Sequence, residues 1–435
     1  MPGASVIFLK TRFRMPLTHK TQSQTKFPVD RVRSQFPALT RDGASIFFDN
    51  AAGAQIPQRV FDAVNEHLLV RNVQRGGAYR ESQEVDSAIA HARTVVAAFL
   101  NATDPNEVAF GMNATSFIRV VSLAIGQSLG DRREIIVTDL DHEANIATWL
   151  ALEREGATIR WWHVRGDGNL YLEDLEPLLG SKTRLVACTV TSNALGTIVD
   201  VAGAARLAHS VGAELFLDCV HYAPHGPVDV QEWQCDYLVC SGYKIFAPHM
   251  GFLWGRRSAL DALPTFREDF LPNTAPSKIE AGTFVYENVA GMAAAIEYLV
   301  ELGGSTGGQA RDVERRHIAA AMRTIRDYEA ELSSALLEGV RHIHGSVIYG
   351  RQSMATLRDR VPTLAFNLKD IPATTVATSL AQKGFAVRGG HMYSPRLMKR
   401  LGLSPDEGLV RASLVHYNTR EEIEGFLKAL EEIAR

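Results

Sequence analysis

Between residues 47 and 255 the sequence alternates short apolar runs with longer stretches of helical periodicity. The short runs are rich in β-branched and aromatic residues and too short for helices, so they predict strands. They span residues 107–110, 134–138, 184–190, 214–217 and 237–240. The longer stretches at 115–126, 145–155 and 201–211 predict helices. Strands and helices that alternate in this way form a mainly parallel sheet covered by helices, so the pattern predicts an α/β fold.

The alternation ends after residue 255, and a different organisation follows. A helix-favouring segment at 287–337 is interrupted by the glycine-rich residues 303–308. Predicted strands at 363–368, 384–387 and 409–414 precede a final helix at 420–433, which indicates a smaller α+β domain. We therefore expect an N-terminal extension at 1–30, a large domain at 47–300, a connecting helical segment at 301–328, and a small domain made of 31–46 and 329–435.

The overall composition excludes several functional classes. The 435 residues include 46 Lys and Arg against 49 Asp and Glu, so no excess charge favours nucleic acid or an anionic membrane surface. No apolar run approaches the about 20 residues of a membrane span. The four cysteines, Cys188, Cys219, Cys235 and Cys240, lack metal-site spacing and lie mostly in apolar runs, which predicts buried, reduced thiols. We expect a soluble cytoplasmic protein without a metal site.

Polar residues follow each predicted strand of the large domain. Ligands of an open parallel sheet bind outside the carboxyl ends of its strands, so these residues are the first candidates for a functional site. They are Ala114 and Thr115 after the first run, His142 after the second, Asn193 after the third, Asp218 and His221 after the fourth, and Ser241, Tyr243 and Lys244 after the fifth. Each residue alone is more often a loop or capping residue, but together they predict one site.

The candidate residues match the requirements of pyridoxal phosphate. A lysine forms a Schiff base with this cofactor, and a carboxylate beside the pyridine nitrogen keeps that nitrogen protonated. Lys244 and Asp218 form the natural pair, and His142 could stack on the ring. Asn193 and His221 could bond the ring hydroxyl. Thr115, Ser241 and the N-terminus of the helix that begins near Ala114 could hold the phosphate.

Seven short motifs in a fixed order carry a family resemblance. They are Asp49-Asn50-Ala51-Ala52, Asp141-His142-Glu143-Ala144-Asn145, Ser192-Asn193-Ala194-Leu195-Gly196-Thr197, Asp218-Cys219-Val220-His221, Ser241-Gly242-Tyr243-Lys244, Glu280-Ala281-Gly282-Thr283 and Arg411-Ala412-Ser413-Leu414. From about residue 47 to the C-terminus the chain resembles the class V aminotransferases, in particular the branch of cysteine desulfurases and selenocysteine lyases. The resemblance implies fold type I, pyridoxal 5'-phosphate, an amino-acid substrate and a homodimer with active sites at the interface.

The same resemblance implies roles for single residues. Lys244 would carry the cofactor as an aldimine, Asp218 would face the pyridine nitrogen, and His142 would stack on the ring. Thr115 and Ser241 would contact the phosphate, and Thr283 would reach the phosphate of the neighbouring subunit. Arg411 would bind the substrate α-carboxylate, for which a bidentate guanidinium is well suited. Arg388, His391 and Tyr393 are further expected substrate contacts.

Three positions depart from the desulfurase pattern. Desulfurases carry a loop cysteine that accepts the substrate sulfur, but Tyr393 occupies that position here and no cysteine follows Cys240. A phenol with a pKa of about 10 is a poor sulfur acceptor near neutral pH, whereas a thiol with a pKa of about 8.5 is readily activated. His221 stands where glutamine is usual, and Tyr243 replaces the histidine before the lysine. We therefore expect cofactor binding without persulfide formation.

Three hypotheses for the function follow. The first is an enzyme that acts on an amino acid through an aldimine and a quinonoid intermediate, as an aminotransferase, a C–S or β-lyase, or an epimerase. The second is a cysteine desulfurase or selenocysteine lyase that uses no loop cysteine. The third is a non-catalytic homologue that serves as a scaffold, against which the retention of Lys244, Asp218, His142 and Arg411 argues, because a scaffold needs none of them.

Overall fold

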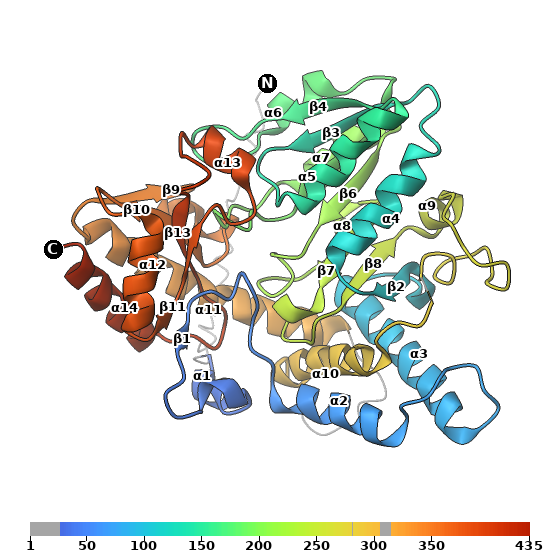
Figure 1. Ribbon diagram of the computed structural model, residues 1–435, viewed down its shortest axis with the longest axis horizontal. Coiled ribbons are helices and arrows are strands. Elements are labelled where there is room, and N and C mark those ends of the chain that lie inside the picture. Colours follow the sequence, from blue (N-terminus) through green and yellow to red (C-terminus); the bar gives the residue numbers. More distant parts are fainter. Residues whose placement is uncertain (1–26, 281, 305–314) are drawn as a thin grey trace, which may run out of the picture.

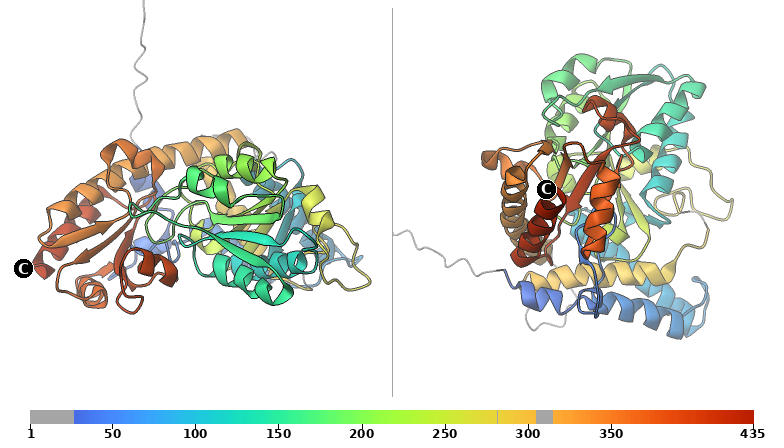
Figure 2. Two further views of the ribbon diagram at one scale, coloured as in Figure 1. Left: turned by 90° about the horizontal axis from the view of Figure 1, so that it is seen from above. Right: turned by 60° about the vertical axis from the view of Figure 1, so that its left-hand side comes forward.

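The computed structural model describes residues 27–280, 282–304 and 315–435, and the chain forms two layered units that lie side by side (Figure 1). Seen from above, the strands of the small unit and those of the large unit form separate layers (Figure 2). Most of the expected N-terminal extension, 1–30, lies outside the described residues. None of the described helices is long and apolar enough to cross a membrane.

The large unit is built on a seven-stranded sheet with the order β2-β8-β7-β6-β5-β3-β4. Its strands are β2 (Val108–Gly111), β3 (Glu134–Thr138), β4 (Thr158–Trp162), β5 (Thr183–Thr189), β6 (Glu214–Asp218), β7 (Tyr237–Ser241) and β8 (Gly251–Gly255). In this sheet β8 runs antiparallel to both neighbours, while the β4-β3-β5-β6-β7 pairs are parallel. The predicted α/β fold with a mainly parallel sheet is confirmed. The apolar pattern did not predict β4 and β8.

Both faces of this sheet are covered, which explains why its strands are continuous apolar runs rather than alternating ones. Ile135 and Val137 face α4 (Ala114–Gly126) and α5 (Ala144–Leu150). Ile136 belongs to the core on the opposite face, with α3 (Arg80–Leu100), α7 (Val201–Ser210) and α10 (Tyr286–Leu302). The predicted helix at 145–155 continues beyond α5 as a 3-10 helix, Ala151–Glu155.

The small unit contains a four-stranded antiparallel sheet with the order β12-β13-β10-β9. Its strands are β9 (Ser346–Tyr349), β10 (Thr363–Leu368), β12 (Arg388–Gly390) and β13 (Leu409–Ser413). The sheet shares a hydrophobic core with three helices: α12 (Ala373–Gln382), α14 (Arg420–Ile433) and the C-terminal half of α11 (Arg315–His342). The predicted strand at 384–387 is replaced by β11 (Phe385–Ala386), which pairs with β1 (Ile46–Phe47), and by β12. Helix α11 crosses the expected boundary at residue 329, so the exact domain limits stay predictions.

The remaining elements are short or lie at the periphery. The helices are α1 (Val29–Arg33), α2 (Gln58–Val70), α6 (Leu172–Leu175), α8 (Val230–Trp233), α9 (Arg257–Ala262) and α13 (Pro395–Arg400). Further 3-10 turns span Pro37–Leu39, Pro105–Glu107, Glu176–Leu178, Gly242–Lys244 and Met354–Asp359. The four cysteines are free and buried, as predicted.

Asn50 joins the two ends of the chain. Its side-chain Nδ2 donates to the carbonyl oxygens of Phe47 at 2.8 Å and Ser413 at 2.9 Å, and its Oδ1 accepts from the Tyr417 hydroxyl. The side chain is buried. Because β1 and the residues after β13 lie far apart in the sequence, this amide holds the N-terminal strand against the C-terminal sheet.

We predict that Asn50→Ala lowers the free energy of unfolding by about 3 kcal/mol, because it leaves buried polar groups without partners, at about 1–3 kcal/mol each. Urea denaturation followed by circular dichroism measures this change. Asn106→Ala is the matched control, since Asn106 is exposed and bonds only locally to Asp104, and it should change the value by less than about 0.5 kcal/mol. Equal effects of the two substitutions would contradict the role of Asn50.

Candidate active site

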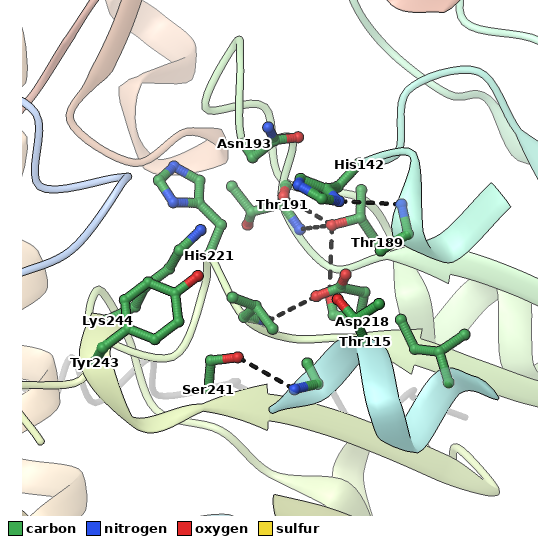
Figure 3. Close-up of a pocket in the computed structure, with 14 residues that line it drawn as sticks. Thr115, His142, Thr189, Thr191, Asn193, Asp218, His221, Ser241, Tyr243 and Lys244 are labelled. Atoms are coloured by element: carbon green, nitrogen blue, oxygen red, sulfur yellow. Dashed lines mark hydrogen bonds between the residues drawn. The ribbon is translucent and has the colours of Figure 1, made fainter. Parts of the chain in front are cut away.

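A pocket with an empty volume of about 440 Å³ lies at the carboxyl ends of β3, β5, β6 and β7, facing the start of α4 (Figure 3). Nine of the residues predicted from the sequence line it: Ala114, Thr115, His142, Asn193, Asp218, His221, Ser241, Tyr243 and Lys244. Ile118, Ala144, Thr189, Thr191 and Val220 complete the lining. The topology of the sheet therefore brings together side chains that are spread over 131 positions of sequence, from 114 to 244.

Lys244 ends the 3-10 turn that follows β7 and is buried. The turn requires glycine at position 242, because a Cβ there would lie 2.7 Å from the carbonyl oxygen of Pro248. Burial lowers the pKa of Lys244 to about 8; the charge of Arg411 acts in the same direction, and Asp218 opposes both. A large fraction of the amine is therefore neutral, and nucleophilic, near pH 8.

Asp218 is the last residue of β6 and is buried. Its Oδ1 accepts a hydrogen bond from the Val220 N–H at 2.9 Å. Burial raises the pKa of Asp218, while the Val220 N–H and the charge of Lys244 lower it. A cationic ring nitrogen beside this carboxylate would act like Lys244 and favour the ionised form.

His142 follows β3, and its Nδ1 accepts from the Ala144 N–H at 3.1 Å. Burial lowers the pKa of His142 to about 4, with smaller contributions from Lys244 and Arg411, so the ring is neutral at pH 7. Because Nδ1 accepts, the single proton of the neutral ring resides on Nε2. A neutral aromatic ring with a fixed tautomer is suited to stack on a flat cofactor.

The N-terminus of α4 provides a site for an anion. Asn113 caps this helix and uses its side chain on the Ser116 N–H, and the Ala114 N–H lies 3.4 Å from the Ser241 hydroxyl oxygen. Strand β8 packs closely here, since a Cβ on Gly251 would lie 2.5 Å from the backbone of Asn113. Helix N-terminal N–H groups beside hydroxyls of Ser241 and Thr115 are a favourable phosphate site.

Two buried polar atoms of the pocket have no partner among the described residues. They are the His221 Nδ1 and the Thr191 hydroxyl oxygen. Buried polar groups in native proteins are nearly always paired, so these atoms indicate a polar ligand. The lysine with a lowered pKa, the buried carboxylate, the neutral imidazole, the helix N-terminus and these free polar atoms together fit pyridoxal phosphate.

The predicted substrate arginines lie outside this lining. Arg411 on β13 is buried and bonds the Asp49 Oδ1 at 2.8 Å and the carbonyl oxygen of Asn193 at 2.8 Å. Arg388 on β12 pairs with the other oxygen of Asp49 at 2.8 Å. A substrate carboxylate would share Arg411 with Asp49. The substrate-binding roles of Arg411 and Arg388 stay predictions.

The segment that carries Tyr393 is docked beside the pocket. The Tyr393 ring centroid lies 5.6 Å from that of His142 and 5.9 Å from that of His391. The Glu143 N–H donates to the Tyr393 carbonyl at 2.8 Å, and the Asn193 amide donates to the Met392 carbonyl at 2.7 Å. The Asn193 Oδ1 also accepts a hydrogen bond from the Ser394 hydroxyl at 3.1 Å, so both the nitrogen and the oxygen of this side-chain amide bond the segment around Tyr393. The bond between Asn193 and the ring hydroxyl of pyridoxal phosphate stays a prediction. His221, whose Nδ1 has no hydrogen-bond partner among the described residues, is the more available of the two candidates for this bond.

Thr283 does not reach the pocket of its own chain. It is exposed, and its hydroxyl accepts from the Gln74 amide. The predicted contact with the phosphate of a neighbouring subunit therefore stays a prediction.

Sequence reasoning missed several residues of the site. Thr191 follows the third predicted strand, so the rule that found Asn193 would also have found it. Thr189 lies within that predicted strand and is the last residue of β5, so the rule passes over it. Asp141 and Asp49 stand in quoted motifs without an assigned role. Asp141 is fully buried beside the Thr138 hydroxyl and the Asn145 amide, and burial raises its pKa to about 8. Only the structure shows that Asp49 contacts both arginines.

Comparisons with known proteins agree with this geometry. The model of the family described as aminotransferase class V matches residues 46–426. The chain is 36% identical to the aminotransferase-like protein FGM3 of Gibberella zeae, over 94% of this chain and 99% of that protein. It is 33% identical to a probable cysteine desulfurase of Synechocystis sp., over 93% of this chain and 95% of that protein. Among solved structures, the cysteine desulfurase of Thermococcus onnurineus NA1 is similar with a TM-score of 0.83 and 27% sequence identity. The cysteine desulfurase CsdA of Escherichia coli is similar with a TM-score of 0.80 and 26% sequence identity. Each similarity covers 94% of this chain and 98% of the other chain.

We predict that Lys244→Ala abolishes covalent attachment of pyridoxal phosphate, because the neutral amine of Lys244 is the nucleophile of the pocket. Reduction with borohydride followed by mass spectrometry of the peptide measures the attachment. Lys278→Ala is the control, since this lysine is also buried but bonds the Asp261 carbonyl outside the pocket. Undiminished attachment in Lys244→Ala would refute the assignment.

The lowered pKa of Lys244 predicts a pH dependence. The neutral fraction of the amine increases as pH rises toward a pKa of about 8 and is nearly complete above it. The rate at which apoprotein attaches pyridoxal phosphate should therefore rise between about pH 6 and 8 and level off above about pH 9. Stopped-flow absorbance measures this rate. A rate that keeps rising to about pH 10.4, the value of an ordinary lysine, would contradict the lowered pKa.

Proposed function

The chain belongs to the aminotransferase class V family and is a pyridoxal phosphate enzyme, and on that premise we propose that it acts at the α-carbon of an amino acid without transferring sulfur to a thiol of its own. The reaction would be a transamination, a C–S or β-elimination, or an epimerisation. All three begin with removal of the α-proton, and they differ in the orientation of the bond that breaks and in the acids nearby.

The absence of an accessible thiol is the observation that carries this proposal. All four cysteines of the sequence are fully buried, at 0% exposure, and none lines the pocket. Burial raises the pKa of each thiol. A thiolate acceptor needs exposure and a lowered pKa, so these cysteines are unsuited to accept sulfur. Tyr393 lies where the resemblance expects the acceptor, and its phenol does not replace a thiol.

The residues of the pocket supply the other parts of the chemistry. Bound pyridoxal phosphate would act as an electron sink for the substrate. The Lys244 amine, with its pKa near 8, can remove the α-proton and return it. Arg411 would hold the substrate carboxylate. Tyr393, whose ring lies beside that of His142, would serve as a donor or a steric boundary beside the substrate. Tyr243 lines the pocket next to Lys244 and is a second candidate acid.

A second candidate function is a desulfurase or selenocysteine lyase that needs no loop cysteine. It is favoured by relatives that are named cysteine desulfurases, of which one from Enterobacter sp. is 34% identical over 94% of this chain. Such an enzyme would break the C–S or C–Se bond with alanine as the organic product. The chalcogen would pass to a thiol reductant from solution, whose oxidation to a disulfide supplies the two electrons that give sulfide or selenide, so no persulfide forms on the protein. The two candidates differ in their product from cysteine.

We also propose that the active protein is a homodimer. Large apolar side chains are exposed in the monomer, with Leu69 at 87%, Phe266 at 90% and Phe270 at 82%. Thr283, which would contact the phosphate in the pocket of the neighbouring subunit, is exposed as well.

A cytoplasmic location stays a prediction, in keeping with four unpaired cysteines.

The experiment that tests the proposal adds L-cysteine, and then a panel of other amino acids, to the holoenzyme. We expect α-deuterium incorporation in D2O, and a keto acid, pyruvate or the opposite enantiomer as product, with no sulfur bound to the protein. Alanine together with a protein persulfide would contradict the proposal. Alanine together with sulfide, formed only when an added thiol reductant supplies the two electrons, would favour the second candidate.

Tyr393→Cys tests the position of the missing acceptor. Because the segment at Tyr393 is held beside His142, a thiol there should gain sulfane sulfur from L-cysteine, which cyanolysis measures. Tyr393→Ser is the matched control, since it also removes the phenol but provides no thiol. If Tyr393→Cys binds cofactor and reacts with cysteine yet carries no sulfane sulfur, the assignment of this position is wrong.

A further inference from the structure

The imidazole of His221 can carry its proton on either of its two ring nitrogens. It lines the pocket, is 3% exposed, and lies on the same side as the Lys244 amine in the view of Figure 3. Burial lowers its pKa well below the usual value, and the charges of His225, Lys244 and Arg411 act in the same direction. Its imidazole is therefore neutral and has one N–H and one lone pair. Which nitrogen carries the proton decides whether His221 donates to the pocket or accepts from it.

Thr363 on β10 contacts the Nε2 of His221. The Thr363 Oγ1 lies 3.0 Å from the His221 Nε2, and Thr363 is fully buried. Within the described residues, His221 is the one hydrogen-bond partner of this hydroxyl that the structure shows. If Nε2 carried the proton, the hydroxyl would accept from it and its own proton would be buried without an acceptor. If the hydroxyl donates to Nε2, every proton on this side is satisfied.

The second arrangement leaves the proton on Nδ1. That nitrogen is the buried atom of His221 that has no protein partner, and His221 lines the pocket. An N–H at this position suits an oxygen that carries negative charge and would be a poor match for a donor. The deprotonated ring hydroxyl of pyridoxal phosphate is such an oxygen.

The backbone around Thr363 is held firmly against the large unit. The Val361 N–H donates to the Gly196 carbonyl at 2.9 Å, and Gly196 adopts a φ of +75°. A Cβ on Gly196 would lie 2.8 Å from the Thr363 carbonyl oxygen, so the two segments approach as closely as glycine allows. These contacts hold Thr363 against the large unit, which also carries His221.

We infer that Thr363 is a positioning residue that fixes the tautomer of His221, so that an Nδ1–H faces the ring oxygen of the bound cofactor. The inference rests on the proposed function, in which the pocket binds pyridoxal phosphate. It adds a residue of the small unit to those that determine the hydrogen bonding of the cofactor. Thr363 touches neither cofactor nor substrate in this arrangement; it acts through His221. Docking of β10 against the large unit then affects the cofactor through His221.

The first test uses apoprotein and does not depend on activity. Nitrogen-15 NMR of the histidine rings should show His221 as the Nδ1–H tautomer in the unaltered protein and in Thr363→Ser. Thr363→Val has nearly the same shape but no hydroxyl, and it should lose this single tautomer. An Nε2–H tautomer in the unaltered protein, or an unchanged tautomer in Thr363→Val, would overturn the inference even if the cofactor binds as proposed.

The second test uses the visible absorption of the holoenzyme as a function of pH. An N–H donor on the ring oxygen stabilises its negative charge, so losing that donor should raise the midpoint of the spectral titration by about one pH unit. We expect this rise in Thr363→Val and not in Thr363→Ser. An unchanged midpoint in Thr363→Val would remove the connection to the cofactor, and absence of cofactor absorbance in every variant would instead reject the proposed function.

Two controls separate positioning from a general loss of structure. Thr197→Val removes another buried threonine hydroxyl, which does not line the pocket, and should leave tautomer and midpoint unchanged. In a His221→Gln background no imidazole tautomer exists, so adding Thr363→Val should not move the midpoint further. A further shift in that background would mean that Thr363 acts on the cofactor by another route.

Discussion

Burial of the large sheet on both faces is the constraint on which the site depends. Strands such as β3 and β5 send apolar side chains to helices on either side, so polar side chains emerge mainly where these strands end. His142, Asp218 and Lys244 all lie at such ends. The same hydrophobic layers that stabilise the fold therefore gather the polar residues into one pocket.

The pocket holds ionisable groups in an environment that opposes their charges. Burial lowers the pKa of Lys244 and raises that of Asp218, although the attraction between the two acts in the opposite direction on each. Isolated buried charges cost several kcal/mol, so such a site is best stabilised by a ligand that supplies the missing partners. A cofactor with a cationic ring nitrogen, an anionic ring oxygen and a phosphate has that charge pattern.

The small unit completes the site from the other side. Arg411 reaches the backbone of Asn193, the segment at Tyr393 lies against His142, and Thr363 contacts His221. Asp49 comes from the N-terminal part of the chain and pairs with both Arg388 and Arg411. The proposed contacts with the substrate and with the ring oxygen of the cofactor would thus depend on how the two units dock, whereas the lining of the pocket belongs to the large unit.

The sequence alone determined the parallel sheet and nine pocket residues, because apolar runs and the polar residues after them are local patterns that topology brings to one edge. It also determined that no thiol follows Cys240. It could not assign β8, a short strand bounded by Gly251 and Gly255, whose place depends on pairing with both β2 and β7. Only the tertiary structure revealed the contacts of Asp49 with two arginines and of Thr363 with His221, since these join residues more than 140 positions apart and leave no periodic signal.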